Sequence, residues 1–351
     1  MEIRLIPESF DPQLYNSTTL HPLQSWEWGE ARKQTGLKII RFGEFSGKIL
    51  KKSYLMTLHK VPMTNFKIGY IPRSGILSKD LLNFLNQIAS KENIIFIKFE
   101  PYIFKSEIRN PRFARRAKLD SSLEVRRTKW ETNSKFKIIN SKHPLFTQWT
   151  IIMDLSKSEK ILMENLKPKT RYNIKLAQKK GVFIKEESNK KGYEIFENLY
   201  FETTKRQHYL GHDKNYHRIV WDNMKNKVSH ILIAYYKDEP LSAYQLFIYK
   251  NRGYYVYGGS SEKHRNFMAS NLLMWESLIF CKNQGCTEFD MWGSLSKNYK
   301  QSDSYAGFTR FKEGYGGNFT QMIGSYDLVI KSFVYRIYNL AYSFRKFILK
   351  I

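Results

Sequence analysis

The sequence contains few of the residues that build disulfide frameworks or metal sites. Its 351 residues include two cysteines, Cys281 and Cys286, and no histidine pair lies near them at metal-ligand spacing. Neither a disulfide framework nor a zinc site is therefore expected, and a reducing, cytoplasmic setting fits this composition.

Long hydrophobic runs are lacking too. No stretch approaches the ~18 consecutive apolar residues of a membrane span, and residues 1–7 lack the hydrophobic core of a signal peptide. There is no Walker loop and no GxGxxG motif after the first strand. No Ser–His–Asp or Cys–His pattern emerges, because His208 is a lone histidine in a polar stretch and Cys281 has no evident histidine partner.

Acidic residues are scarce relative to basic ones. Lysine and arginine number 58 against 32 acids, a net charge of +26, while hydrophobic residues make up 42% and aromatic residues 15%. The chain is therefore globular and long enough for two domains or one large one. Its charge favours a polyanionic partner such as RNA, a phosphorylated substrate or an anionic membrane surface. A lysine-rich overall composition is the alternative explanation.

Apolar periodicity predicts the same order of elements in both halves of the chain. The first half has two strands, a strand entering a turn, a helix and a strand that ends in an acid, at 38–45, 49–59, 69–75, 79–91 and 93–100. The second half repeats this order at 229–236, 241–249, 254–259, 272–284 and 289–290. An internal duplication that gives two related mixed α/β subdomains is expected, with chance recurrence of common units as the alternative. The basic segment 105–142 has a weaker pattern and is expected to be exposed.

Residues Asp327–Ile351 carry apolar side chains at every third or fourth position, which is typical of an amphipathic helix. Lys331, Lys346 and Lys350 fall off this apolar stripe. The helix is expected to pack back on the body of the protein. Alternatively, it lies on a membrane surface as a basic amphipathic helix.

The stretch Gly253–Gly317 combines features of a binding cleft. A tyrosine-rich strand, a helix, a strand ending in Asp290 and Lys312 beside a glycine-rich turn occur one after another. Asp290 is expected to cap a turn rather than to take part in catalysis.

Two other basic features are candidates for binding anions. The stretch 167–181 opens with Pro168, which suits the first turn of a helix. Four of its basic residues are candidates for contacting phosphate or RNA: Lys169, Arg171, Lys175 and Lys179. A solvated helix face explains the same stretch equally well. Arg206, at the end of another predicted helix, could hold a phosphate or carboxylate through its guanidinium.

Mixed α/β units of this kind are similar to acyltransferases of the GNAT type, which bind the coenzyme A pyrophosphate at a helix N-terminus through a glycine-containing loop. The corresponding residues here are 265–269, and Met268 stands where a glycine is needed. Coenzyme A is therefore not expected.

Six short motifs, in this order, resemble the FemABX family, the aminoacyl-tRNA-dependent transferases that add amino acids to peptidoglycan precursors. They are Gln24–Gly29, Tyr70–Arg73, Thr170–Ile174 with Lys179–Gly181, Trp275–Glu276, Phe289–Gly293 and Phe311–Gly317. The resemblance covers nearly the whole chain. It implies a mixed α/β (α+β) fold of two tandem GNAT-like subdomains, one of residues 1–147 plus 320–351 with the C-terminal amphipathic helix, the other of residues 148–319. Some members carry a coiled-coil insertion, but no heptad pattern lies between Lys180 and Ser229, so the shorter form is expected.

The resemblance also implies a reaction. An amino group on the peptide side chain of lipid II or UDP-MurNAc-pentapeptide attacks the ester carbonyl of an aminoacyl-tRNA and forms an amide. Such an ester is already activated, so positioning and charge stabilisation suffice. No cofactor and no metal are expected. The expected partners are aminoacyl-tRNA and the peptidoglycan precursor, for a cytoplasmic monomer that touches an anionic membrane if its acceptor is lipid-linked.

By similarity, Lys312 matches a lysine thought to steady the developing oxyanion and the tRNA end, and Phe311 lies beside it. The other implied substrate-binding residues are Arg32 or its neighbour Lys33, Arg73, Glu100, Arg206, Tyr255 and Tyr257. Arg32 and Arg206 match phosphate-binding positions, and the two tyrosines match a Tyr-x-Tyr pair that lines the substrate channel. The tyrosines could instead pack against a helix. A non-catalytic relative that binds tRNA or membrane, or a GNAT-like N-acyltransferase with another donor, are the alternative functions.

Overall fold

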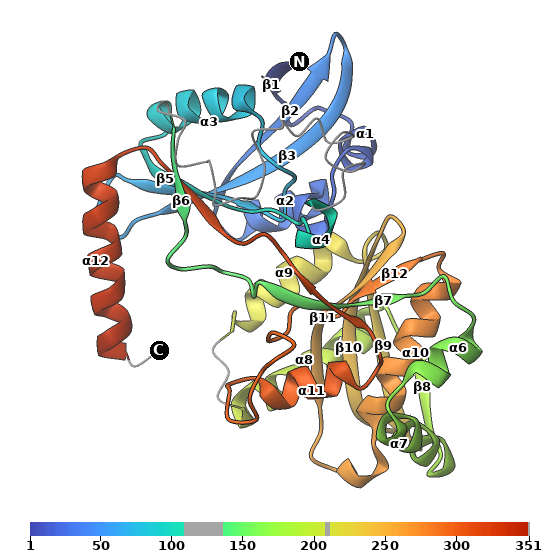
Figure 1. Ribbon diagram of the computed structural model, residues 1–351. Helices are drawn as coiled ribbons and strands as arrows, with labels where there is room; N and C mark the ends of the chain where they lie inside the picture. The colour runs from blue at the N-terminus through green and yellow to red at the C-terminus, as the bar shows by residue number, and fades with distance from the viewer. Residues whose placement is uncertain (109–135, 208–210, 350–351) are drawn as a thin grey trace. The chain divides into compact units, whose positions relative to one another are not determined.

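The computed structural model describes residues 1–108, 136–207 and 211–349, with side chains in the last helix described as far as Phe344. His208 and most of the basic segment 105–142 lie outside these residues. The chain divides into two compact units. Unit 1 comprises Met1–Phe146 and Met322–Ile351, and unit 2 comprises Thr147–Gln321. Each unit has its own sheet with helices packed on it (Figure 1).

Unit 1 is built on a seven-stranded sheet in the order β1-β2-β3-β4-β5-β14-β6. Its strands are β1 (Glu2–Leu5), β2 (Lys38–Ser46), β3 (Ile49–Lys60), β4 (Lys67–Pro72), β5 (Ile94–Glu100), β6 (Lys137–Asn140) and β14 (Tyr326–Val329). Its helices are α1 (Pro12–Ser17), α2 (Trp26–Gln34), α3 (Lys79–Lys91), α4 (Lys105–Ile108) and α12 (Ser332–Leu349). Strands β4 and β5 are parallel. A parallel pair needs a crossover connection, and α3 supplies it.

Unit 2 has a seven-stranded sheet in the order β13-β7-β12-β11-β10-β9-β8. Its strands are β7 (Trp149–Asp154), β8 (Val182–Glu186), β9 (Ser229–Tyr236), β10 (Glu239–Tyr249), β11 (Arg252–Ser260), β12 (Glu288–Asp290) and β13 (Asn318–Gln321). Its helices are α6 (Glu159–Asn165), α7 (Pro168–Lys179), α8 (Lys190–Arg206), α9 (Lys214–Met224), α10 (Ala269–Asn283) and α11 (Ala306–Glu313). Here β11 and β12 are the parallel pair, joined through α10.

The two sheets have the same strand order and the same single parallel pair. Next to this pair lies β14 in the first sheet and β7 in the second. The chain passes from β6 of unit 1 into β7 of unit 2 and returns from β13 into β14, so β14 joins the first sheet only after the whole of unit 2. The repeated order of elements, with two mixed α/β sheets, is confirmed. Between Lys180 and Ser229 the described residues form β8, α8 and α9 and contain no coiled-coil insertion.

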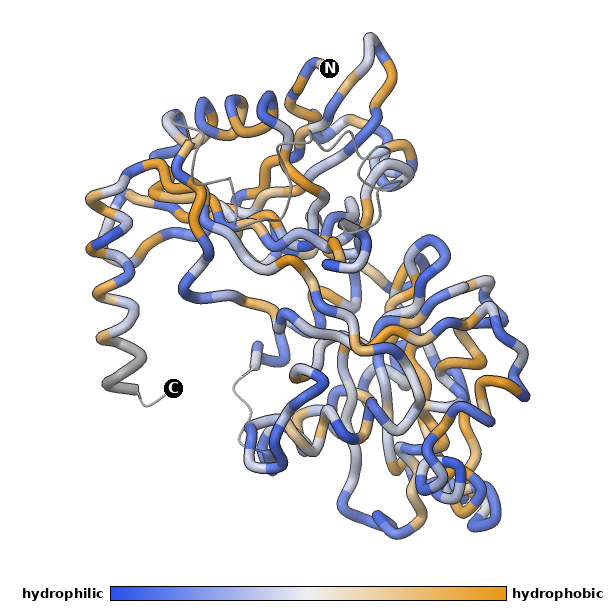
Figure 2. Tube along the Cα trace, in the orientation of Figure 1, coloured by the Kyte–Doolittle hydropathy of each residue, from blue (hydrophilic) through white to orange (hydrophobic). Residues whose placement is uncertain are grey.

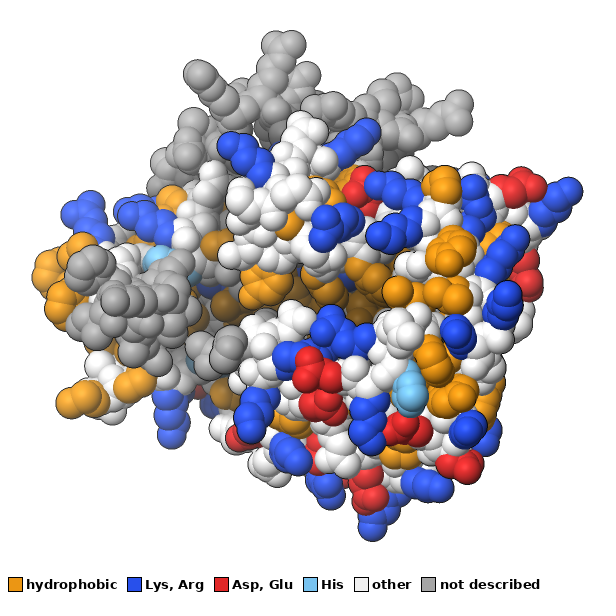
Figure 3. Space-filling model, turned by 90° about the horizontal axis from the view of Figure 1, so that it is seen from below, with side chains coloured by type: hydrophobic (Ala, Val, Ile, Leu, Met, Phe, Trp, Pro, Cys, Tyr) orange, Lys and Arg blue, Asp and Glu red, His pale blue; other side chains and the backbone are white. Residues whose placement is uncertain are grey.

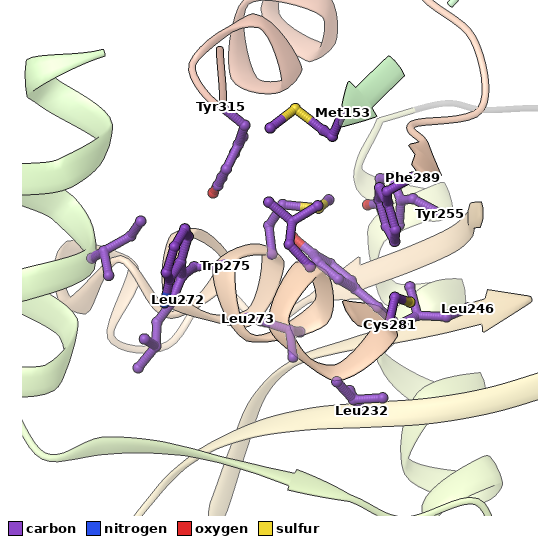
Figure 4. Close-up of a cluster of buried hydrophobic side chains, with 14 of the residues drawn as sticks. Met153, Leu232, Leu246, Tyr255, Leu272, Leu273, Trp275, Cys281, Phe289 and Tyr315 are labelled. Atoms are coloured by element: carbon purple, nitrogen blue, oxygen red, sulfur yellow. The ribbon is translucent and has the colours of Figure 1, made fainter. Parts of the chain in front are cut away.

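Alternation along the strands of unit 2 buries side chains on both faces of its sheet. On β9, Leu232 and Ala234 join the cluster under α7 and α10, whereas Ile231, Ile233 and Tyr235 join the cluster under α8. Figure 4 shows the first cluster, where Trp275 and Leu272 of α10 lie near Tyr315. In Figure 2 α10 is largely orange and α7 largely blue, so α10 is the central buried helix and α7 a surface helix.

The prediction of one helix over Asp327–Ile351 is wrong at its start. Residues Tyr326–Val329 form β14, which pairs with β5 and β6, and the helix begins only at Ser332. Asp327 explains the difference, because its carboxylate lies 3.0 Å from Lys98 Nζ inside the sheet and accepts a hydrogen bond from Tyr335. A pattern of buried residues this short does not separate strand from helix.

Candidate active site

A buried lysine at the end of α11 is the most unusual group in unit 2. The Lys312 side chain is fully buried, and its Nζ donates to the carbonyl oxygens of Met291, Gly293 (2.7 Å) and Trp292 (3.5 Å). Three acceptors match the three N–H donors of an ammonium group. The contact with Trp292 is at the limit of a hydrogen bond, so it is the one most easily exchanged.

The carbonyls that receive Lys312 belong to a tight turn after β12. Asp290, the last residue of β12, accepts a hydrogen bond of 2.8 Å from the backbone N–H of Trp292. It therefore caps the turn, as predicted. Trp292 has a φ of 57°, in the left-handed region that non-glycine residues rarely occupy. The turn thereby presents consecutive carbonyl groups to one cation.

Aromatic rings enclose the amine on its other side. Lys312 Nζ lies 3.9 Å from the ring centroid of Phe308 and 5.5 Å from that of Tyr255. Burial lowers the pKa of Lys312 to about 7, although the charge of Asp290 opposes this shift. Near neutral pH the lysine is therefore present in both charged and neutral forms, which ordinary lysines are not.

Tyr255 and Tyr257, which the resemblance implies line the substrate channel, lie on opposite faces of the sheet. Their pairing with β10 contains a bulge, since Leu246 faces Tyr255 whereas its neighbour Gln245 faces Tyr257. A bulge adds one residue to a strand and so reverses the facing of the residues beyond it. Tyr255 lies in the cluster around α10, where Figure 4 labels it, and its ring centroid is 5.5 Å from Lys312 Nζ, whereas Tyr257 packs against Tyr200 on the α8 side.

Phe311 and the glycine-rich turn hold the end of α11 in place. The Phe311 ring packs edge-on against Tyr315 at 5.4 Å, and the Tyr315 hydroxyl donates to the Asn271 carbonyl at 2.9 Å. Gly316 has a φ of 75°, and a Cβ there would lie 2.2 Å from the Asn165 carbonyl oxygen. Glycine is required for this close approach.

Arg206 lies at the junction of α8 and β11. Its guanidinium donates to the Ser260 carbonyl from Nη1 and Nη2 (both 3.1 Å) and to the Ser260 hydroxyl (3.2 Å). It also lies 3.6 Å from the carboxylate of Glu202. These contacts join α8 to the end of β11, so in this state Arg206 holds protein groups rather than an exposed anion site.

The four basic residues proposed for α7 do not behave alike. Lys169, Lys175 and Lys179 are exposed, but Arg171 donates to the carbonyls of Glu164 (2.8 Å) and Leu166 at the end of α6. Tyr172, 64% exposed, lies on the same side of the helix as the lysines. Lys and Arg side chains are spread widely over the molecular face in Figure 3, with acidic groups among them.

In unit 1, Glu100 is the centre of a buried polar cluster. It accepts hydrogen bonds from the Tyr70 hydroxyl (2.7 Å) and from the backbone N–H groups of Leu145 (2.8 Å) and Phe146 (3.3 Å). Burial and the neighbouring charge of Glu100 raise the pKa of Tyr70 well above its usual value, while the charges of Arg73 and Arg32 oppose the shift. The structure therefore brings Arg32, Arg73 and Glu100 together around Tyr70.

The side chains of Arg32 and Lys33 point to different surroundings. The Arg32 guanidinium lies 5.8 Å from the centroid of the Trp28 ring. Burial, and to a lesser extent the charge of Arg32, lower the pKa of His59 to about 4. Lys33 is exposed and pairs with Glu8 at 2.5 Å. Of the two, Arg32 belongs to the Glu100 cluster.

Sequence reasoning missed two members of these sites. His59 of β3 lies beside Tyr70, with ring centroids 6.4 Å apart, and Phe308 covers Lys312. The position of His59 beside Tyr70 could not be predicted from residue spacing, because it is set by the register between β3 and β4. Phe308 lies four residues before Lys312, so helical spacing could have found it.

The chain matches the model of the FemAB family over residues 6–239 and 232–343. It belongs to the FemAB family. Curated relatives named lipid II:glycine glycyltransferase are 22% identical in Staphylococcus epidermidis and 23% identical in Staphylococcus aureus, each over 90% of this chain and 89% of the relative. The resemblance that six motifs indicated is therefore confirmed, and the chain is an aminoacyltransferase by family.

Solved structures agree with the fold of this FemAB member. The crystal structure of FemX matches with a TM-score of 0.80 at 18% identity, over 96% of this chain and 99% of that one. The C-terminal domain of a putative lysylphosphatidylglycerol synthetase from Agrobacterium fabrum matches with a TM-score of 0.51 at 8% identity, over 87% of each chain. The expected fold of two mixed α/β subdomains is thus confirmed.

Metal-binding clusters and membrane spans are both absent from the described residues. These residues contain no group of three His, Cys, Asp or Glu side chains that could hold a metal ion. In the same part of the chain, no helix is both long enough and apolar enough to span a bilayer.

Proposed function

We propose that this protein transfers an amino acid from aminoacyl-tRNA to the peptide side chain of a peptidoglycan precursor, lipid II or UDP-MurNAc-pentapeptide. The amine nitrogen of the acceptor attacks the ester carbonyl carbon, a C–N bond forms, and the ester C–O bond breaks. The terminal ribose hydroxyl leaves with the proton that the amine loses. Family membership and the names of the staphylococcal relatives support this proposal. Because aminoacyl-tRNA is made in the cytoplasm, the proposal implies a cytoplasmic protein.

The buried cation in unit 2 is the single observation that carries the proposal at the level of chemistry. Acyl transfer develops negative charge on the carbonyl oxygen, and a preorganised donor in a water-poor site stabilises it. Lys312 is fully buried under Phe308 and Tyr255. We assign it this role, with its weak contact to the Trp292 carbonyl exchanged for the oxyanion. Phe311 and Tyr255 position the lysine and the donor ester.

The acceptor and the tRNA are assigned to other surfaces. In unit 1, Arg32 and Arg73 supply positive charge beside Glu100, which suits a precursor that carries both phosphate and amine groups. In unit 2, Lys169, Lys175 and Lys179 with exposed Tyr172 suit an RNA backbone. No coenzyme A is required.

The experiment is to incubate the purified protein with charged tRNAs, glycyl-tRNA first, and with lipid II or UDP-MurNAc-pentapeptide, and to measure the mass of the acceptor. A gain of one aminoacyl residue supports the proposal and identifies donor and acceptor together. The matched control for Lys312→Met is Lys282→Met, because Lys282 Nζ also ends on a backbone carbonyl, that of Leu155, at 2.7 Å. No gain with either acceptor, or gain from acyl-CoA instead, overturns the proposal.

A further inference from the structure

Helix α12 is fixed in orientation by contacts along one side. The Phe96 ring of β5 packs against Tyr335 at 5.0 Å and against Tyr338 at 5.3 Å. The Tyr335 hydroxyl donates to Asp327 at 2.8 Å, so the rotation of the helix about its axis is set by a buried hydrogen bond. Figure 1 shows α12 in red beside β5.

The opposite side of α12 carries a second hydrophobic stripe. Phe333, Ile337, Leu340 and Phe344 recur at intervals of four, three and four residues and are 76%, 50%, 73% and 66% exposed. Residues at this spacing lie on one face of a helix. Single exposed hydrophobic residues are normal, but a continuous exposed row of large ones marks an interaction surface.

The segment of sequence that contains this stripe carries charge of one sign. From residue 328 to residue 351 the sequence has five basic residues and no acidic one. Arg336 is exposed on α12, one residue before Ile337 of the stripe. A second copy of α12 docking here would bring like charges together, which is unfavourable. A large apolar stripe flanked by Arg336, in a segment without acidic residues, matches the headgroup region of an anionic bilayer.

We propose that the stripe Phe333–Ile337–Leu340–Phe344 of α12 docks this protein onto an anionic lipid bilayer. The helix lies along the surface, with its apolar row at the level of the acyl chains and Arg336 at the phosphate groups. In unit 1, Tyr335 and Tyr338 keep the other face of the helix on β5. The inference builds on the proposed function by favouring a lipid-linked acceptor, but the binding itself needs no substrate.

Vesicle co-sedimentation of the full chain tests the inference. Wild-type protein should sediment with vesicles of phosphatidylcholine and phosphatidylglycerol. The variant Phe333→Ser, Ile337→Ser, Leu340→Ser should have a partition coefficient lower by on the order of a hundredfold, since each of these side chains gains from burial in the acyl region. Arg336→Ser should lower it about fivefold on these vesicles and leave it unchanged on pure phosphatidylcholine.

The matched control changes three hydrophobic residues elsewhere in unit 1 that are each more than half exposed, with Leu20→Ser, Ile49→Ser and Met63→Ser. It should bind as the wild type does. Thermal unfolding should be unchanged in both triple variants, because all the altered side chains face solvent. Equal binding by wild type and the α12 variant overturns the inference, as does wild-type protein that binds no vesicles. A dimer that the α12 substitutions dissociate also overturns it.

Failure of this inference can be told apart from failure of the proposed function. If docking fails while the proposed function holds, the protein binds no vesicles, yet one of the two acceptors, lipid II or UDP-MurNAc-pentapeptide, still gains the mass of an aminoacyl residue. If the proposed function fails, the protein still sediments with anionic vesicles while neither acceptor gains mass.

Discussion

Lys312→Met keeps the length of the side chain and removes its charge, and it changes the stability of unit 2 in two opposing ways. The carbonyls of Met291 and Gly293 lose hydrogen bonds from a charged donor, at about 1.5–3 kcal/mol each. Against this, the variant no longer buries a charged amine. The cost of that burial in the wild type is roughly 5 kcal/mol, since burial lowers the pKa of Lys312 from 10.5 to about 7. Because the two effects nearly cancel, the free energy of unfolding at pH 7 should change by less than about 2 kcal/mol.

The same substitution should act strongly on catalysis. Removing one preorganised oxyanion donor typically lowers kcat by about 10²–10³-fold. Transfer by Lys312→Met should therefore fall by this factor while its unfolding midpoint in urea stays near that of the wild type. Lys282→Met, which removes another carbonyl-bound lysine from unit 2, should keep its transfer rate. Equal losses in both variants would show that the effect of Lys312 is structural.

The pH dependence of stability provides a separate check. Below about pH 7 the Lys312 amine is charged in the folded and unfolded states alike, and its burial cost is then fully present. Between about pH 7 and 10.5 it is neutral only when folded, so the folded state binds one proton fewer. Wild-type stability should therefore rise relative to Lys312→Met by about 1.4 kcal/mol per pH unit in this window. A constant difference in unfolding free energy between pH 7 and 9 would refute the lowered pKa.

Three further outcomes are expected from single contacts. Lys98→Met or Asp327→Asn alone should lower the free energy of unfolding in urea by about 3–5 kcal/mol, because each leaves the other partner of a buried ion pair unpaired. The double variant Lys98→Met, Asp327→Leu leaves no buried charge and should lower it by less than either single variant. Gly259→Ala should destabilise by about 3 kcal/mol, because a Cβ there lies 2.4 Å from the backbone of α8, whereas Gly307→Ala, with open space around it, should be nearly neutral in thermal unfolding. Lys175→Ser with Lys179→Ser should reduce the slope of log K against log salt for tRNA by about 1.5, and exposed Lys190→Ser with Lys191→Ser should leave it unchanged.

The regular part of the fold could be predicted from the sequence because each element had a local cause. The helix Lys79–Lys91 has a capping Ser78 and one apolar face, and it was predicted to the residue. Strand Ser229–Tyr236 alternates between two buried faces, so its bounds were also found. Asp290 was correctly expected to cap a turn, since an acid at a strand end commonly does so.

Side-chain directions could not be predicted where long-range pairing sets them. The bulge between Tyr255 and Tyr257 arises from the register with β10, and nothing in the tyrosine spacing reveals it. The choice between Arg32 and Lys33 likewise depends on how α2 packs against β2 and β3. Strand β14 was predicted as part of a helix because its four buried residues fit the periodicity of a helix as well as that of a strand. Its partners β5 and β6 lie far away in sequence, so no local signal indicates the pairing.

Arg206 shows how a residue can be a candidate by sequence and acquire a different role by structure. Two of its guanidinium nitrogens donate hydrogen bonds to the Ser260 carbonyl oxygen, a geometry that lysine cannot reproduce. If Arg206 positions the end of β11, then Arg206→Lys and Arg206→Ala should lower the unfolding temperature and the affinity for the acceptor to a similar extent. If Arg206 instead binds substrate phosphate through its charge, Arg206→Lys should keep most of that affinity. Glu202→Gln, which removes only a partly exposed ion pair, should change neither measurement. Binding assays with UDP-MurNAc-pentapeptide and thermal unfolding on these three variants decide between the roles, and the contacts to Ser260 favour positioning.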